Sequence, residues 1–212
     1  MIAFDETKYP TSKRVGVASE VTLITPIKEG RVEGEYRTYR ERLEEVLDDV
    51  QERELQGLPT PVGLLRQIHF ARWVILDVPG RAGNLLFTSN FDGEMKLYFR
   101  NFALELTSDI DRVWGNCEGY PGAHDFDRLW RYVKEHQIET SLFYCAYPNL
   151  TMPQILRLDG LRKGFDEFVG KVGPILETMK QMAGPDDAQT LAGAFNALLQ
   201  SARLEKPPVA LA

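Results

Sequence analysis

The segment from residue 114 to residue 122 reads Trp-Gly-Asn-Cys-Glu-Gly-Tyr-Pro-Gly and brings a thiol, a carboxylate, a phenol and an indole into one short stretch. Loops of this kind often line pockets, and glycine lets the backbone approach a ligand closely. Asn116 and Tyr120 are therefore candidate ligand-binding residues, because they offer hydrogen bonds beside aromatic surface.

Two residues of the same loop are candidates for catalysis. Cys117 can act as a nucleophile if a histidine, His124 or His136, lies near it. Otherwise it is an inert thiol, which is the usual state of a cysteine in a loop. Glu118 can act as an acid or base, although no second carboxylate is spaced to pair with it.

A second group of polar residues lies in an apolar stretch, residues 65–77, that we predict to be a strand. His69 shares one face of this strand with Ala71 and Trp73. One interpretation makes His69 a general base or a haem ligand in an apolar pocket. The other makes it a core or interface histidine bonded to a neighbouring element.

Arg72 points to the opposite face of the same strand, since three positions separate it from His69. An unpaired charge among apolar neighbours is costly. We therefore expect Arg72 to pair with a carboxylate, with Asp92 and Glu118 as the candidates. Anion binding is the alternative role of this side chain.

A turn follows the next apolar run and contains Asn90, Asp92 and Gly93. A turn that leads into a helix can present amides to an anion, so Asn90 and Asp92 are candidate binding residues. The structural interpretation is a helix capped by Asp92, with Gly93 in the turn. No glycine run with a following lysine is present, which excludes a phosphate loop.

The sequence predicts no metal site. Cys117 and Cys145 lack zinc-ligand spacing. The chain's histidines, His69, His124 and His136, could form a site only through tertiary proximity. His136 lies near the predicted end of a helix, where the macrodipole already favours a histidine.

Hydrophobic periodicity predicts the elements that position these residues. Apolar residues alternate in residues 15–27, which indicates a strand. Further strands are predicted at 65–77, 84–91 and 142–147. Steps of three and four predict helices at 35–53, behind Asp92, around 126–133 and from Thr151 onward. Because residues 65–77 are apolar on both faces, we expect that strand to lie in the interior of the sheet.

The predicted order is β-α-β-β-α-(α)-β followed by helices. This order predicts an α+β fold, a ferredoxin-like antiparallel four-stranded sheet (split βαβ) with additional C-terminal helices. We expect a domain over residues 1–150 and a helical extension over 151–205 packed on it. The second sheet face then needs a cover, for which the candidates are the C-terminal helices, a second subunit or a bound apolar ligand.

Four motifs carry a resemblance, namely His-Phe-Ala-Arg-Trp from residue 69, Leu-Leu-Phe-Thr-Ser-Asn-Phe-Asp-Gly from residue 85, the loop at 114–122, and Tyr-Pro at 147–148. Over residues 66–151 the chain resembles a group of uncharacterised bacterial proteins, to which no activity is attached. Its fold is similar to that of dimeric α+β barrel proteins, which include haem peroxidases and small-molecule monooxygenases. That resemblance implies oxidative chemistry if the protein is an enzyme.

Composition narrows the classes of partner. The chain has 212 residues, of which 43% are hydrophobic and 26% charged, and its net charge is −6. This balance is typical of a globular protein and disfavours nucleic acid as the main partner. No run approaches the ~18 apolar residues of a membrane span, and the first ten residues lack a signal-peptide core. We therefore expect a cytoplasmic protein with free thiols.

Two functions follow from these observations. The first is binding of a small apolar ligand, with haem as one candidate, between the sheet and its cover. His69, Arg72 and the loop at 114–122 would surround the ligand. The second is a non-catalytic self-associating or partner-binding module, in which a homodimer or the C-terminal helices bury the second sheet face and the polar residues are structural.

Overall fold

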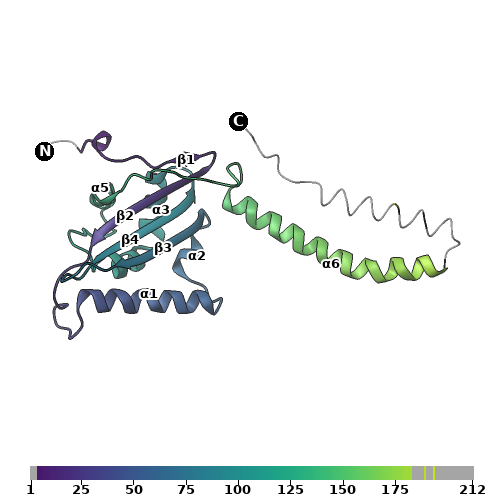
Figure 1. Cartoon of the computed structure of the whole chain (residues 1–212), viewed down its shortest axis with the longest axis horizontal. Coiled ribbons are helices and arrows are strands. Elements are labelled where there is room, and N and C mark those ends of the chain that lie inside the picture. The colour runs from purple at the N-terminus through teal and green to yellow at the C-terminus, as the bar shows by residue number, and fades with distance from the viewer. Residues whose placement is uncertain (1–3, 183–188, 190–192, 194–212) are drawn as a thin grey trace. The chain divides into compact units, whose positions relative to one another are not determined.

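The computed structural model of the chain describes residues 4–182, Gln189 and Gly193 (Figure 1). The chain divides into two compact units, Met1–Leu156 and Arg157–Ala212. The first unit contains a sheet with helices. The described part of the second unit belongs mainly to one long helix. The end of the helical extension predicted over residues 151–205 lies outside the described residues.

The sheet has four antiparallel strands, β1 (Arg14–Val15), β2 (Ala18–Pro26), β3 (Ile68–Leu76) and β4 (Asn84–Asp92), in the order β1-β2-β4-β3. The predicted α+β class with a four-stranded antiparallel sheet is therefore confirmed. Both β2 and β3 pair with β4, so these two strands run in the same direction on either side of it.

The strand predicted at residues 142–147 is not formed, and that prediction was wrong. The place beside β2 is taken partly by β1, which pairs Arg14 with Ser19 and Val15 with Ala18. A tight turn at Gly16, whose φ is 64°, allows the chain to return at once. Further along β2, a single bridge joins Leu23 to Gln137.

The interior position predicted for residues 65–77 was also wrong, because β3 is the edge strand of the sheet. Its apolar residues do lie on both faces, but only one face is buried. Phe70 and Val74 on the other face are 64% and 42% exposed. An apolar side chain in a strand is thus not evidence that the strand is covered on both sides.

The buried face of the sheet meets the helices α3 (Met95–Glu105), α4 (Thr107–Trp114) and α5 (Phe126–His136). Alternate residues of β4 point into this core: Leu85, Phe87, Ser89 and Phe91 are all buried. Phe87 lies at its centre. The Phe87 ring centroid is 4.9 Å from that of Trp73 and 5.2 Å from that of Trp114, the latter edge to face.

Two further helices complete the first unit. Helix α1 (Tyr39–Leu55) begins at a capping box, in which Thr38 and Glu41 satisfy each other's backbone amides. It therefore starts four residues after the predicted position and buries Leu43 in the core. The short helix α2 (Pro61–Leu64) leads into β3, and a 3-10 turn, η1 (Glu6–Lys8), precedes β1.

Helix α6 (Met152–Met182) begins in the last residues of the first unit and includes the described residues of the second up to Met182. Its start agrees with the N-terminal signal at Thr151, whose amide and hydroxyl both donate to Gln154. Among the described helices, none combines the length and the apolar character needed to cross a membrane.

We predict that Phe87→Ala lowers the free energy of unfolding by roughly 3–5 kcal/mol, because it opens a cavity where three elements meet. Denaturant titration measures this loss. The matched control is Leu104→Ala on the exposed side of α3, expected within ~0.5 kcal/mol of the parent. Equal effects of the two changes would contradict the assignment of Phe87 to the core.

Candidate functional site

His69 and Asp92 form a close pair at one end of the sheet. A bulge between Ile68 and Phe70 shifts the register of β3, and His69 contacts the end of β4. Its Nε2 atom lies 2.8 Å from Asp92 Oδ1, and the two side chains are 12% and 14% exposed. Because an ionised carboxylate only accepts, the proton of this bond belongs to Nε2.

The second oxygen of Asp92 is also engaged. Oδ2 accepts the backbone N–H of Met152, the first residue of α6, at 2.7 Å. Asp92 therefore binds the start of α6 and does not cap α3, whose N-cap is Glu94. The carboxylate joins three segments of the first unit, which is a structural role that requires no substrate.

Arg72 does not form the predicted pair. Its side chain is exposed on the outer face of β3, opposite Thr88 of β4. Within the described part of the chain no carboxylate lies within 4 Å of its guanidinium group. The prediction assumed that Arg72 was buried, whereas on an exposed face water satisfies the charge. Asn90 lies on the same outer face, between Glu20 and Phe70 on the neighbouring strands.

The loop at 114–122 lies at the far end of β2 from His69 and Asp92, where it packs beside α1 and α4. Asn116 is fully buried and its side chain is satisfied: Oδ1 accepts from Arg42 at 2.7 Å, and Nδ2 donates to Arg112 O and Val113 O. Tyr120 donates to Asp111 Oδ1 at 2.7 Å. Burial raises the pKa of the Tyr120 phenol, and the hydrogen bond to Asp111 raises it further.

Cys117 is fully buried beside Thr25, whose hydroxyl donates to Sγ at 3.4 Å. Burial raises the pKa of its thiol to about 11, so the thiolate needed by a nucleophile is scarce at neutral pH. His124 is exposed, and His136 Nδ1 lies 2.8 Å from Tyr132 O. Glu118 points to solvent, while its N–H donates to Pro26 O.

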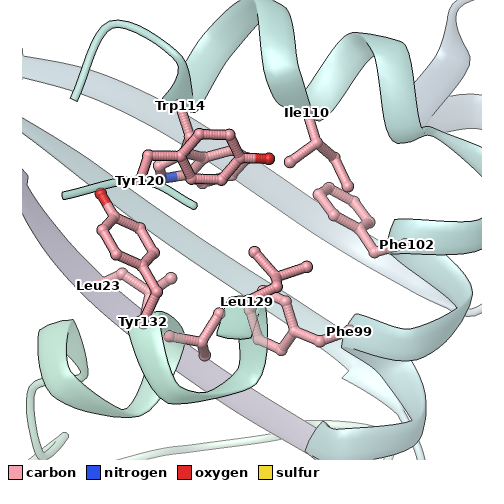
Figure 2. Close-up of a pocket in the computed structure, with 9 residues that line it drawn as sticks. Leu23, Phe99, Phe102, Ile110, Trp114, Tyr120, Leu129 and Tyr132 are labelled. Carbon is pink, nitrogen blue, oxygen red and sulfur yellow. The ribbon is translucent and has the colours of Figure 1, made fainter. Parts of the chain in front are cut away.

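A small cavity remains between β2, the helices α3, α4 and α5, and this loop (Figure 2). Side chains from β2, α3, α4, α5 and the loop converge on it, and Trp114 and Tyr120 help to fill it. The cavity measures about 10 Å³, which is room for one water molecule at most. It offers no space for haem or for any other organic ligand.

The two groups of candidate residues lie at opposite ends of β2. Asp92 is paired with Ala18 at one end, and Cys117 forms a bridge with Ile27 at the other. Nine residues of extended strand span roughly 30 Å. One small ligand therefore cannot contact both His69 and the loop at 114–122.

An open groove of about 410 Å³ lies beside Asp92. Its walls come from the end of α2 and the residues before β3, from the end of β4, from α3 and from the start of α6. They include Leu64, Arg66, Gln67, Asn101 and Glu105. Sequence patterns do not reveal this groove, since its residues are scattered over four segments. Among the described residues, no cluster of three or more histidine, cysteine, aspartate or glutamate side chains could hold a metal ion.

The largest unexplained feature is the outer face of the sheet, which we call the open face. It consists of the outward side chains Ile24, Phe70, Arg72, Val74, Leu86 and Thr88. In Figure 1, helix α3 lies behind the sheet, and its rings pack against Phe87 and Phe91, which alternate along β4 with the outward residues. The clue in the sequence was the apolar character of both faces of residues 65–77.

Comparisons of the chain with protein-family models, with curated proteins and with solved structures find no significant match. Functional inference therefore depends on the geometry alone.

We predict that native protein at about pH 8 incorporates one iodoacetamide per chain, at Cys145, since the buried Cys117 thiol stays protonated roughly three units below its pKa. Mass spectrometry counts the labels. The control Cys145→Ser should remain unlabelled until denaturant is added. Rapid labelling of this variant in its native state would show that Cys117 is accessible.

We predict that Arg72→Met changes the free energy of unfolding of the single chain, at a protein concentration that keeps it monomeric, by less than ~0.5 kcal/mol, because in one chain the side chain is exposed and holds no partner among the described residues. A loss on the order of 3 kcal/mol in denaturant titration would instead indicate a buried ion pair.

Proposed function

We propose that this protein is a non-catalytic, self-associating module, in which a second copy of the chain covers the open face. The observation that carries this proposal is a continuous apolar row across three strands. Ile24 of β2 is paired with Leu86 of β4, and Leu86 is paired with Val74 of β3. Phe70 lies on the same face of β3, separated from Val74 by Arg72, and it is the most exposed apolar residue of the open face.

The energetics favour covering this row. Full burial of one large apolar side chain contributes about 1.5–3 kcal/mol. Phe70 and Val74 are exposed, and Ile24 and Leu86 are half-buried, so covering the row would gain the larger share of this contribution from the two residues of β3. Interfaces between identical subunits are also the most apolar class.

Charge on the open face supports the same conclusion. Arg72 lies among the apolar residues, and the described part of its own chain supplies no carboxylate to it. Arginine is enriched at protein interfaces because it combines an apolar stem with a fixed charge.

The small-ligand hypothesis has weaker support. The small cavity holds about one water molecule. The 410 Å³ groove beside Asp92 is open, and both positively and negatively charged side chains line it. A polar small molecule in that groove is the second candidate function. A haem-dependent oxidative enzyme has less support, because the cavity lined by Phe99, Trp114 and Tyr132 is far too small for haem.

We also infer that the sheet derives from the ferredoxin-like plan. β2 and β3 run in the same direction with α1 between them in the chain, and β4 lies between them in space. This arrangement supports one split βαβ unit. The position of a fourth long strand is occupied by β1 and by the bridge at Gln137.

We predict that the parent protein is a dimer and that Phe70→Glu converts it to a monomer, because a carboxylate cannot be buried in an apolar interface without a partner. Light scattering coupled to size exclusion, over a concentration series, measures the mass. Leu104→Glu, which places the same charge on the exposed side of α3, should remain dimeric.

A monomeric parent over the whole series would contradict the proposal. In that case the thiol of a Val74→Cys variant reports what happens to the face. Rapid alkylation means that the face is open to solvent, and slow alkylation in dilute solution means that another part of the same chain covers it. Either result would remove the second copy as the occupant.

A further inference from the structure

Residues 141–147 form an arch beside the sheet. Before the arch, Thr140 donates to Glu20 Oε2 at 2.6 Å, and after it Pro148 O accepts the N–H of Val17 at 2.7 Å. These two anchors on the β2 side are three residues apart, or roughly 10 Å along a strand. The eight residue-to-residue steps from Thr140 to Pro148 would span roughly 26 Å when extended, so the chain between the anchors cannot lie extended along β2.

The arch exposes side chains that normally lie in a strand. Leu142 and Tyr144 are 83% and 80% exposed, and Tyr147 is also exposed. The composition Leu-Phe-Tyr-Cys-Ala-Tyr has high β propensity. In its own chain the edge of β2 is already occupied by β1, and among the described residues no backbone hydrogen bond joins the arch to a strand.

The opposite edge of the sheet is open. β3 pairs with β4 on one side only. Open edges attract other strands unless proline, lysine or a bulge protects them. The sequence of β3, Ile-His-Phe-Ala-Arg-Trp-Val-Ile-Leu, contains neither proline nor lysine, and its bulge lies at the extreme end, near His69.

We propose that the arch of one copy adds to β3 of the second copy as an antiparallel strand. This inference rests on the proposed function, since it names the segment by which the second copy engages the open face. Each copy donates its arch and accepts its partner's, so the exchange closes as a symmetric dimer. Main-chain hydrogen bonds to a free edge are a recurrent mode of association.

Strand directions are compatible with this exchange. When two open faces meet across a two-fold axis parallel to the strands, β3 of one copy lies over the β2 side of its partner. β2 and β3 run in the same direction. The arch runs against β2, because its anchors pass from Glu20 back to Val17. It therefore runs antiparallel to β3 of the partner.

Side-chain alternation is also compatible. Leu142 and Tyr144 are two residues apart and share one face of an extended segment. In the added strand this face continues the apolar row of Phe70 and Val74. The arch residues 141–147 carry no charge, so burying them leaves no charged group without a partner.

A cross-linking experiment tests the proposal on the full chain. Two variants are made in a Cys145→Ser background, Arg72→Cys on β3 and Tyr144→Cys on the arch, and are treated with a short bifunctional thiol reagent. We expect a covalent dimer when the two variants are mixed and none from either alone, because positions 72 and 144 meet only between copies. Leu104→Cys replaces Arg72→Cys in the control mixture and should give no product.

Tyr144→Asp provides an independent measurement. We expect it to weaken dimerisation about tenfold or more without changing the circular dichroism spectrum, since the side chain is exposed in one chain and buried in the exchange. If Phe70→Glu yields monomers while the mixture does not cross-link and Tyr144→Asp dimerises like the parent, the exchange is wrong and the open-face dimer stands. A monomeric parent overturns both.

Discussion

The position of β4 between β2 and β3 is the constraint on which the rest of the structure depends. Its register with both neighbours determines which side chains face the helices and which face outward. Phe87 and Phe91 enter the core, and Leu86 and Thr88 enter the open face. A slip by one residue would exchange these sets and bury Thr88 in place of Phe87, so the aromatic core and the pairing reinforce each other.

Because one face of the sheet is covered by helices and the other is open, the outer surface offers a binding site more readily than the interior does. On the helical side, rings from β3, β4, α3 and α4 fill the interior and leave about 10 Å³. Close packing of that kind stabilises the fold but leaves no room for a ligand. On the outer side, apolar area remains exposed at Phe70 and Val74, and burial of that area can drive association.

The polar residues that first suggested chemistry mostly hold chain segments together. Asp92 joins His69 of β3 to the first amide of α6, and Asn116 joins α1 to the end of α4. Buried polar groups that are fully bonded in this way add specificity to a fold. Arg72, by contrast, has no hydrogen-bond or ion-pair partner among the described residues, and it lies on the surface that we assign to association.

Periodicity in the sequence was sufficient to predict the α+β class, the three long strands and most of the helices, because alternation in steps of two or of three to four is a local property of the chain. Only the tertiary structure decided the rest. Whether β3 lay inside the sheet depended on strand order, which local pattern does not contain. The segment 142–147 lost its place to β1 through competition for one edge of β2. The separation of His69 from Cys117 followed from the length of β2, a distance between residues far apart in sequence. Local propensity thus determined where most helices and strands form, and pairing between distant residues determined which strands lie side by side.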